Sequence, residues 1–399
     1  MVIESVGVQE IFDSRGDPTI EVELKVAGSH PFFAKIPSGK SKGKNEAVAL
    51  SFAEAQNTLK DGFAREIEGF DGETVKELDS FLLAADGTKN KEKLGGNVML
   101  GISIAFARAL AHEREEELWE ALHREFFPKE DASKKPLIFA NLINGGVHAD
   151  NNLDIQEYMA VVETKGAYSE SIQRLISFYE RLGFVIEEER DVKRLPVGDE
   201  GGYSVNFKNN FAPVEMMEKL IFESELQNEF RIALDAAASS FYKDGNYRFE
   251  GSSLSTKQLI ERYRAYFESS KLLCSIEDPC DESDFEGFKE MVEIAGGRWI
   301  VGDDLTTTDP ERIGKYAEEK LITGAIIKAN QIGTLTETCE AIRAAQERGV
   351  RCIVSHRSGE TDDLFLVHIA KACGADGVKI GAPVKERISK YDELMRLYQ

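Results

Sequence analysis

Hydrophobic and polar residues alternate near the start of the chain and then follow helical spacing. Residues 19–26, TIEVELKV, alternate as a half-buried strand does, and residues 13–18 have turn composition between it and an earlier apolar run. Apolar residues then recur three or four positions apart in residues 45–60 and 97–125, which predicts helices. We therefore expect an opening β-hairpin within a mixed α+β unit that occupies residues 1–130.

The rest of the chain repeats one pattern, in which a short apolar run ends in polar residues and is followed by a helical stretch. The runs are RIALD, LLCSIED, WIVGDD, GAIIKAN, CIVSHRS and GVKIGAP. Repeated βα units predict a parallel sheet, and this many predict a closed barrel. The linker-like PKEDASKKP, residues 128–136, separates the two parts. We expect an α/β protein with a smaller α+β capping domain, residues 1–130, before a TIM-type (β/α)8 barrel, residues 131–399.

Composition narrows the class of protein and its partners. The chain is 42% hydrophobic and 30% charged, as in soluble globular proteins, and its net charge of −22 disfavours nucleic acid and anionic membranes as partners. The longest mostly apolar stretch, residues 98–107, has about half the length of a membrane span. The first residues lack the pattern of an export signal, so we expect a cytoplasmic protein. The five cysteines have no metal-site spacing and are expected to be reduced.

Each apolar run of the second part ends in a residue that can carry chemistry. In a (β/α)8 barrel the C-terminal ends of the strands meet at one mouth, so these ends would converge. A single such residue could be a helix N-cap or a loop residue, but six in phase indicate a catalytic centre. The six residues are Asp235, Glu277, Asp303, Lys328, His356 and Lys379.

The three acids among them predict a metal site. Asp235, Glu277 and Asp303 are hard oxygen ligands on consecutive strands, which suits Mg²⁺, and without a cation they would repel one another. Lys328 follows an apolar strand and could be a snorkelling or ion-paired lysine. Burial beside Mg²⁺ and Lys379 would instead favour its neutral amine and make it a working base.

Ten short motifs, in order along nearly the whole chain, resemble those of the enolase family. They are DSRGDPT at 13, NGGVHA at 144, IQEYM at 155, GDEGG at 198, LDAAAS at 234, SIEDP at 275, DDLT at 303, IKANQIGT at 327, SHRSGET at 355 and VKIGAP at 378. The resemblance implies a lyase, phosphopyruvate hydratase, which reversibly dehydrates 2-phosphoglycerate to phosphoenolpyruvate in glycolysis and gluconeogenesis. It also implies two Mg²⁺ ions per site, the second bound together with substrate.

The resemblance implies catalytic roles for residues of these motifs. Lys328 would remove the proton at carbon 2, and Mg²⁺ would hold the resulting enediolate, as is general for the enolase superfamily. Glu200 would protonate the departing hydroxyl, assisted by Glu157 and Gln156. His148 follows two glycines and would lie on a mobile loop over the substrate, although the residue alone could be a surface loop histidine.

The remaining binding roles concern phosphate and carboxylate. Arg357 offers paired donors that match phosphate oxygens, and the resemblance places Ser358 and His356 beside it. Lys379 would bind on the carboxylate side of the substrate.

The family's lid, of the form PSGASTG, supplies a ligand to the second metal ion, and here the segment is PSGKSKG, residues 37–43. Ser41 is retained as that ligand, whereas Lys40 and Lys42 replace small residues. These lysines could be a solvated basic loop. They could instead attract the substrate phosphate, stabilise closure, or alter substrate choice.

Two further expectations rest on the resemblance. Arg396 and Glu21 match an ion pair between subunits, so a homodimer, or a higher homo-oligomer, is expected. One alternative is a superfamily hydratase that acts on a related phosphorylated or phosphono acid. Another is a non-catalytic binding protein on the same scaffold, which would have no need to keep an acid, a base and three metal ligands.

Overall fold

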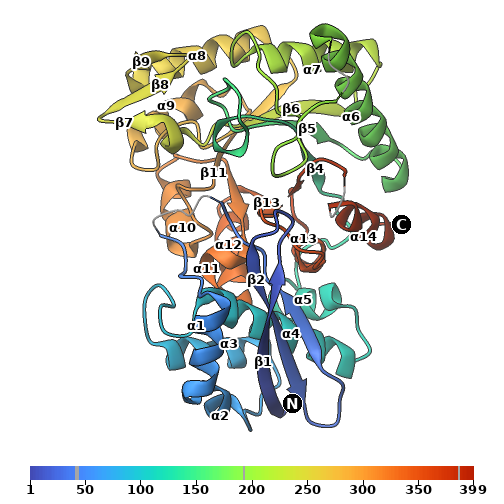
Figure 1. Cartoon of the computed structure of the whole chain (residues 1–399), viewed down its shortest axis with the longest axis vertical. Helices are drawn as coiled ribbons and strands as arrows, with labels where there is room; N and C mark the ends of the chain where they lie inside the picture. Colours follow the sequence, from blue (N-terminus) through green and yellow to red (C-terminus); the bar gives the residue numbers. More distant parts are fainter. Residues whose placement is uncertain (41–44, 192–193, 385–386) are drawn as a thin grey trace.

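The computed structural model describes residues 1–40, 45–191, 194–384 and 387–399. It has two parts stacked along the long axis of the molecule (Figure 1). The N-terminal sheet and its helices lie at one end, and a closed barrel with its surrounding helices forms the other. None of the described helices combines the length and the hydropathy that crossing a bilayer requires.

The N-terminal sheet has three antiparallel strands, β1 (Ile3–Phe12), β2 (Pro18–Val26) and β3 (Phe32–Lys35). The predicted hairpin is β1 with β2, and β3 was not foreseen. Ile20, Val22 and Leu24 are fully buried on one face of β2, and the helix α4 packs there. The alternation in this strand therefore reflects one face toward the core and one toward solvent.

The N-terminal helices differ in their bounds from the expected ones. The helix expected from residue 45 begins only at Phe52, because Ser51 caps it in a capping box with Glu54. The stretch 97–125, predicted to be helical, forms two helices. The elements are α1 (Phe52–Thr58), a π-helical turn (Leu59–Phe63), α2 (Ala64–Ile67), α3 (Val75–Asp86), α4 (Gly96–Glu113) and α5 (Leu118–Phe126).

The second part is the predicted eight-stranded barrel, closed in the order β10, β11, β12, β13, β14, β4, β5, β6. Its strands are β4 (Leu137–Asn144), β5 (Glu157–Val162), β6 (Phe230–Asp235), β10 (Leu273–Glu277), β11 (Trp299–Gly302), β12 (Gly324–Ile327), β13 (Arg351–Ser355) and β14 (Gly377–Ile380). Apolar side chains fill the interior, among them Phe139, Met159 and Ile326.

One strand departs from the all-parallel sheet that the repeats predicted. β5 runs antiparallel to both β4 and β6, because the chain returns from β4 through the loop 145–156 without a crossover helix. The N-terminal end of β5 therefore lies at the mouth, where the other strands have their C-terminal ends. Glu157, the first residue of this strand, is paired with Asp235, the last residue of β6.

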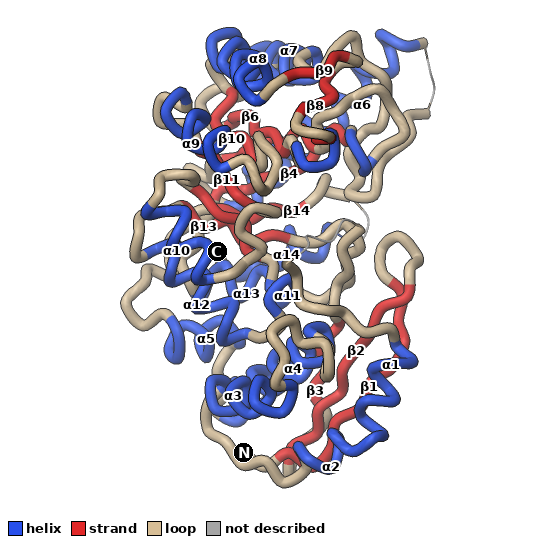
Figure 2. The backbone as a smooth tube through the Cα atoms, turned by 90° about the vertical axis from the view of Figure 1, so that its left-hand side faces the viewer, coloured by secondary structure: helices blue, strands red, loops and turns tan. Residues whose placement is uncertain are grey.

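Helices surround the barrel, and a small sheet extends from it (Figure 2). The helices are α6 (Tyr168–Arg190), α7 (Ala212–Glu223), α8 (Thr256–Ser269), α9 (Phe285–Ile294), α10 (Pro310–Glu318), α11 (Ala329–Ile332), α12 (Leu335–Gln346), α13 (Phe365–Ala372) and α14 (Ile388–Leu397). The small sheet has the strands β7 (Tyr242–Lys243), β8 (Asn246–Phe249) and β9 (Ser252–Leu254), and 3-10 turns cover Gly146–His148 and Ala238–Phe241. All five cysteines have free thiols.

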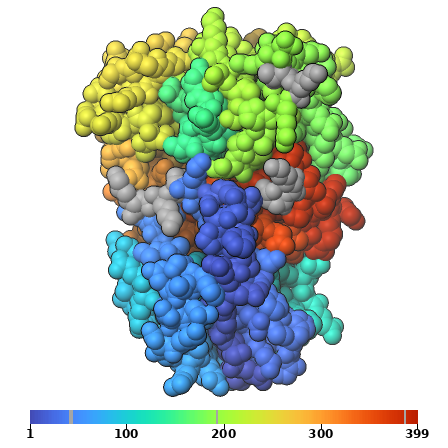
Figure 3. Space-filling model, in the orientation of Figure 1, coloured from blue at the N-terminus to red at the C-terminus, as the bar shows by residue number. Residues whose placement is uncertain are grey.

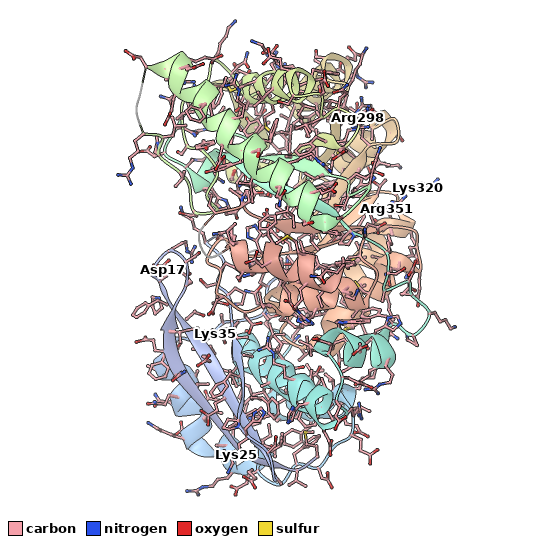
Figure 4. The ribbon with its side chains drawn as sticks, turned by 90° about the vertical axis from the view of Figure 1, so that its right-hand side faces the viewer. Asp17, Lys25, Lys35, Arg298, Lys320 and Arg351 are labelled. Carbon is pink, nitrogen blue, oxygen red and sulfur yellow. The ribbon has the colours of Figure 1, made fainter. Side chains whose placement is uncertain are left out.

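The N-terminal part packs directly against the barrel (Figure 3). The turn between β1 and β2 points toward the barrel, as the position of Asp17 shows, whereas Lys25 lies at the far end of the sheet (Figure 4). The backbone N–H of Ser14 in this turn donates to the carbonyl of Glu360 at 2.8 Å. Ser38 and Gly359 exchange backbone hydrogen bonds of 2.8 and 2.9 Å. The N-terminal part thus reaches the C-terminal ends of the barrel strands.

Candidate active site

A cavity of about 470 Å³ lies at the mouth of the barrel and is lined by both parts of the chain. Most of the candidate residues line it, and so does Lys40 of the N-terminal part. Glu277 is buried beside it rather than in its lining. Ser41, the expected ligand of a second metal ion, and Lys42 fall outside the described residues. The candidates that line the cavity are His148, Gln156, Glu157, Glu200, Asp235, Asp303, Lys328, His356, Arg357, Ser358 and Lys379.

Lys379 lies within β14 and reaches three carboxylates of other strands. Its Nζ lies 3.1 Å from Asp235 Oδ2, 2.8 Å from Glu277 Oε2 and 3.1 Å from Glu157 Oε2. Burial alone would lower the pKa of this lysine, but the surrounding carboxylates raise it well above its usual value. Its ammonium is therefore a fixed positive charge within the acidic cluster.

One ammonium does not balance the carboxylates around it. The pKa of Glu277 is raised well above its usual value, first by burial and then by the charge of Asp235, although Lys379 opposes both. Glu277 and Asp235 face each other in register on β10 and β6, and Asp303 directly follows β11, the next strand. Two lysine ammonium groups do not balance these three carboxylates and Glu157, and hard oxygen donors with excess negative charge fit a divalent cation such as Mg²⁺.

Within the described part of the chain, two groups bring three possible ligand atoms within 4.8 Å of one another: His148 with Glu157 and Glu200, and Asp278 with Asp303 and Asp304. The expected trio of Asp235, Glu277 and Asp303 is not drawn together as closely, because lysine ammonium groups contact each of these acids.

Asp278 was missed by the sequence analysis, although it lies in the quoted motif SIEDP. Its carboxylate accepts hydrogen bonds from the backbone N–H groups of Asp303 at 3.0 Å and Asp304 at 2.7 Å. It therefore fixes the turn that carries the metal-ligand candidate Asp303.

Lys328 directly follows β12 and forms a hydrogen-bonded ion pair with Asp303. Burial lowers the pKa of Lys328, but the Asp303 carboxylate reverses the direction, and the pKa is raised overall. The expectation of a neutral amine assumes Mg²⁺ nearby and stays a prediction. In the structure Asp303 contacts the ammonium directly, a contact that a cation on Asp303 would weaken.

Two histidines and an asparagine surround the candidate acid Glu200. His148 Nδ1 lies 3.6 Å from Glu200 Oε1, and His356 Nε2 lies 3.6 Å from Glu200 Oε2. Asn141, which the sequence analysis missed, donates its Nδ2 hydrogen to Glu200 Oε2 at 2.9 Å. Glu157 completes the group, with its Oε1 3.9 Å from His148 Nδ1.

The two glutamates of this group have opposite proton affinities. Burial would raise the pKa of Glu200, but His356, His148 and Arg387 lower it well below its usual value. The pKa of Glu157 is raised well above its usual value, first by burial and then by the charge of Glu200. Burial lowers the pKa of His356 to about 4, so this histidine is neutral near pH 7. Of this buried pair, Glu157 therefore binds a proton more tightly than Glu200 does.

Glycines allow the loop 198–202 to approach the end of β4 closely. Tyr203 N–H donates to Leu142 O at 2.8 Å, and Asn144 N–H donates to Tyr203 O at 3.0 Å. A Cβ on Gly202 would lie 2.6 Å from Asn144 Oδ1. The loop can therefore lie against the strand only without side chains at this point, and this contact sets the position of Glu200.

The candidate phosphate ligand Arg357 is held by two residues that the sequence analysis missed. Its Nη1 donates to Asn330 Oδ1 at 2.8 Å and to Glu46 Oε2 at 3.1 Å, and its Nη2 also donates to Glu46. Asn330 was within a quoted motif, but nothing in the sequence singled out Glu46. Ser358 Oγ accepts a hydrogen bond from the backbone N–H of Lys40 at 3.0 Å.

The residues expected at a subunit interface have partners within the chain. Arg396 pairs with Glu117 at 2.7 Å and with Glu393 at 2.6 Å, whereas Glu21 accepts a hydrogen bond from Gln9. The homodimer therefore stays a prediction.

Comparison with known proteins finds a matching family model for each of the two parts of the chain. A family model described as "Enolase, N-terminal domain" matches residues 3–122, and one described as "Enolase, C-terminal TIM barrel domain" matches residues 133–399. The enolase of Methanopyrus kandleri is 39% identical over 99% of this chain and 95% of its own length. Those of Acidothermus cellulolyticus and Aeropyrum pernix are 37% and 36% identical, over 99% of this chain and 94% and 93% of their own lengths.

Proposed function

This chain belongs to the enolase family, and from that premise we propose that it catalyses the reversible dehydration of 2-phosphoglycerate to phosphoenolpyruvate. The observation that carries the proposal is one cavity lined by both a lysine and buried glutamates. Lys328 pairs there with Asp303, and Glu157 and Glu200 lie together beside two histidines. Dehydration needs such an arrangement, because a base removes one proton and an acid supplies another.

Lys328 is the proposed base. Its Nζ takes the proton from carbon 2 of the substrate, for which the amine must first be neutral. Asp235, Glu277 and Asp303 are the proposed Mg²⁺ ligands. When bound there, Mg²⁺ supplies positive charge that stabilises the negative charge that develops on the substrate carboxylate. Lys379 adds a fixed positive charge on the same side, in keeping with its proposed role beside that carboxylate.

Glu200 is the proposed acid for the departing hydroxyl. The opposite pKa shifts of Glu157 and Glu200 support this role, because a proton bound by Glu157 could pass to Glu200 and make Glu200 a donor. His148 lines the cavity beside both carboxylates. Gln156 Nε2 donates to Asp235 Oδ2 at 3.4 Å, and we assign it to the leaving-group side with Glu157.

Arg357, Ser358 and His356 are the proposed phosphate-binding residues. They are consecutive at the end of β13, are buried, and line the cavity. The guanidinium suits phosphate, because its planar pairs of N–H donors match the spacing of phosphate oxygens.

The remaining assignments follow from family membership and composition. We propose two Mg²⁺ ions per site, the second bound with substrate and Ser41, and a role in glycolysis and gluconeogenesis. We also propose a homodimer or higher homo-oligomer in the cytoplasm that has no nucleic acid or membrane partner, consistent with the net charge of −22. The proposed division into domains is residues 1–130 and 131–399.

The test is the absorbance at 240 nm when purified protein meets 2-phosphoglycerate, first with Mg²⁺ and then with EDTA. A rise that depends on the metal is the expected result. Lys40, which places an additional ammonium at the cavity, favours one alternative, a related phosphorylated or phosphono acid as substrate. No rise from folded, metal-loaded protein would make that alternative the leading one.

A further inference from the structure

Lys40 connects the phosphate side of the cavity to the acid side. Its backbone N–H donates to Ser358 Oγ at 3.0 Å. Its side chain extends the other way, and Nζ donates to Asp199 Oδ2 at 2.9 Å. Asp199 directly precedes Glu200, the proposed acid. One residue of the N-terminal part therefore contacts a substrate-binding serine and the loop that carries the acid.

The segment before Lys40 is fixed to the barrel, so its side chain starts from a defined position. Ser38 exchanges backbone hydrogen bonds with Gly359, and its Oγ donates to Asp13 Oδ2 at 2.6 Å. Arg15 Nη2 donates to Ser38 Oγ at 2.8 Å. A residue whose support is rigid can orient its neighbours.

The loop with Glu200 is also attached to the barrel through its backbone. Gly198 N–H donates to Gly202 O at 2.8 Å, which closes the loop on itself, and Glu200 O accepts from Ala382 N–H at 2.9 Å. Asp199 points away from these contacts toward Lys40. The ion pair thus supports the side of the loop that faces the N-terminal part.

We propose that Lys40 is a positioning residue, which holds the loop 198–202 through Asp199 and thereby sets the position of Glu200. This inference rests on the proposed function of Glu200 as the acid. The Lys40 side chain is 44% exposed and that of Asp199 is 24% exposed, so the pair is weaker than a buried one, and we expect a change of about two- to fivefold in rate. The competing explanation is that the Lys40 ammonium binds the substrate anion directly.

Steady-state kinetics of matched variants separate these explanations. Lys40→Met keeps the apolar stem and removes the charge, and Asp199→Asn removes the partner charge. We expect both to lower kcat to a similar extent with little change in KM, and the double variant to lower it no further. Exchange of the proton at carbon 2 should stay at the wild-type rate in both, because that step uses Lys328. The exchanged pair Lys40→Asp with Asp199→Lys should recover part of kcat.

Lys134→Met is the matched control. Lys134 forms an ion pair of 3.0 Å with Asp376, with side chains 43% and 13% exposed, and it lies outside the cavity. We expect wild-type kcat and KM from it. The proposal is overturned if Lys40→Met raises KM while Asp199→Asn changes nothing, since Lys40 would then bind substrate itself.

Hydrogen exchange tests the ion pair even if the wild-type protein proves inactive on 2-phosphoglycerate. In the free protein, the amides of residues 197–203 should exchange faster in Lys40→Met and Asp199→Asn than in wild type and Lys134→Met. Equal exchange in all four proteins would overturn the positioning role. If the wild-type protein is inactive but the two variants exchange faster, the proposed substrate is wrong. The proposal that Lys40 holds the loop would still stand.

Discussion

The guanidinium of Arg357 lies against the carboxylate of Glu46, with Nη1 and Nη2 each 3.1 Å from Oε2. Both side chains are buried, and they come from different parts of the chain. Gln331 extends the contact, because its Nε2 lies 3.4 Å from Glu46 Oε1 and 3.1 Å from Asp303 Oδ1. The N-terminal part thus orients the proposed phosphate ligand and contacts the proposed metal site through one amide.

We expect Glu46→Gln to lower both stability and substrate affinity. A buried ion pair that loses one partner leaves the other charge uncompensated, so the free energy of unfolding should fall by about 3 kcal/mol. The less firmly oriented Arg357 should raise the KM for 2-phosphoglycerate and the inhibition constant of inorganic phosphate several-fold. Glu318→Gln is the control, since it breaks an exposed pair with Arg348 and should change neither. Unchanged KM in Glu46→Gln would show that Arg357 needs no orienting carboxylate.

The base and the acid can be separated by isotope exchange at carbon 2 of the substrate. Lys328→Ala should abolish this exchange, because the proposed base is gone. Glu200→Gln should slow elimination by about a hundredfold or more and leave the exchange measurable, because the first proton transfer does not need the acid. Equal loss of exchange in both variants would contradict the assignment.

Divalent metal should stabilise the protein as well as support activity. A ligand that binds only the folded state raises the unfolding temperature as its concentration rises above its dissociation constant. We expect Mg²⁺ to raise the melting temperature of EDTA-treated wild-type protein and to have little effect on Asp303→Asn. The control is Asp244→Asn, a change at an exposed turn residue with positive φ, a backbone conformation that asparagine accepts. A full Mg²⁺ response in Asp303→Asn would remove this residue from the ligand set.

The buried carboxyl of Asp79, which lies outside the cavity, should make the stability of the protein depend on pH. Burial raises the pKa of this carboxyl from 3.8 to about 7, although its Oδ2 accepts a hydrogen bond of 2.8 Å from Thr336 N–H. The folded protein therefore holds the proton more tightly than the unfolded chain does, and Asp79 makes the protein less stable as pH rises from about 4 to about 7. Asp79→Asn should remove this dependence. The difference in unfolding free energy between the variant and wild type should therefore be roughly 2 to 4 kcal/mol more favourable to the variant at pH 8 than at pH 4.

Denaturant unfolding at several pH values checks this prediction. Thr336→Val serves as a comparison, because it keeps the carboxyl and the backbone hydrogen bond but removes a hydroxyl that lowers the Asp79 pKa, so the pH dependence should persist. A stability difference between Asp79→Asn and wild type that stays constant from pH 4 to pH 8 would mean that the carboxyl titrates normally.

The sequence predicted the barrel because its strands share a signal that depends only on local order. Each parallel strand is a short apolar run followed by a polar residue. The pattern therefore predicts that these polar residues lie together at one end of the barrel. β5 breaks this rule, since its functional residue Glu157 stands at its first position. Its direction depends on the missing crossover helix, and the repeat pattern does not contain this information. β3 is too short to produce a clear alternation.

Most of the candidate residues line one cavity, but their partners were only partly visible in the sequence. Asp235, Glu277 and Asp303 were identified from strand ends, which the fold places side by side. Glu46 and Asn141 act by contact with residues far away in the sequence, and such contacts leave no local pattern. The neutral amine of Lys328 stays a prediction, because it assumes Mg²⁺ nearby, whereas the raised pKa in the structure follows from the direct contact with Asp303.

Closure of the barrel has a consequence for how the chain folds. β4 and β5 form a local hairpin, whereas the pairing of β14 with β4 joins Gly377 to Leu137 across almost the whole barrel sequence. Pairings between distant residues form slowly, so this seam should close late in folding. Lys379 is part of β14, so its ammonium reaches the acids Glu157, Asp235 and Glu277 only when this strand pairs. Before that step these acids repel one another. Divalent cations should therefore speed refolding as well as catalysis, since they can neutralise these acids before the last strand arrives.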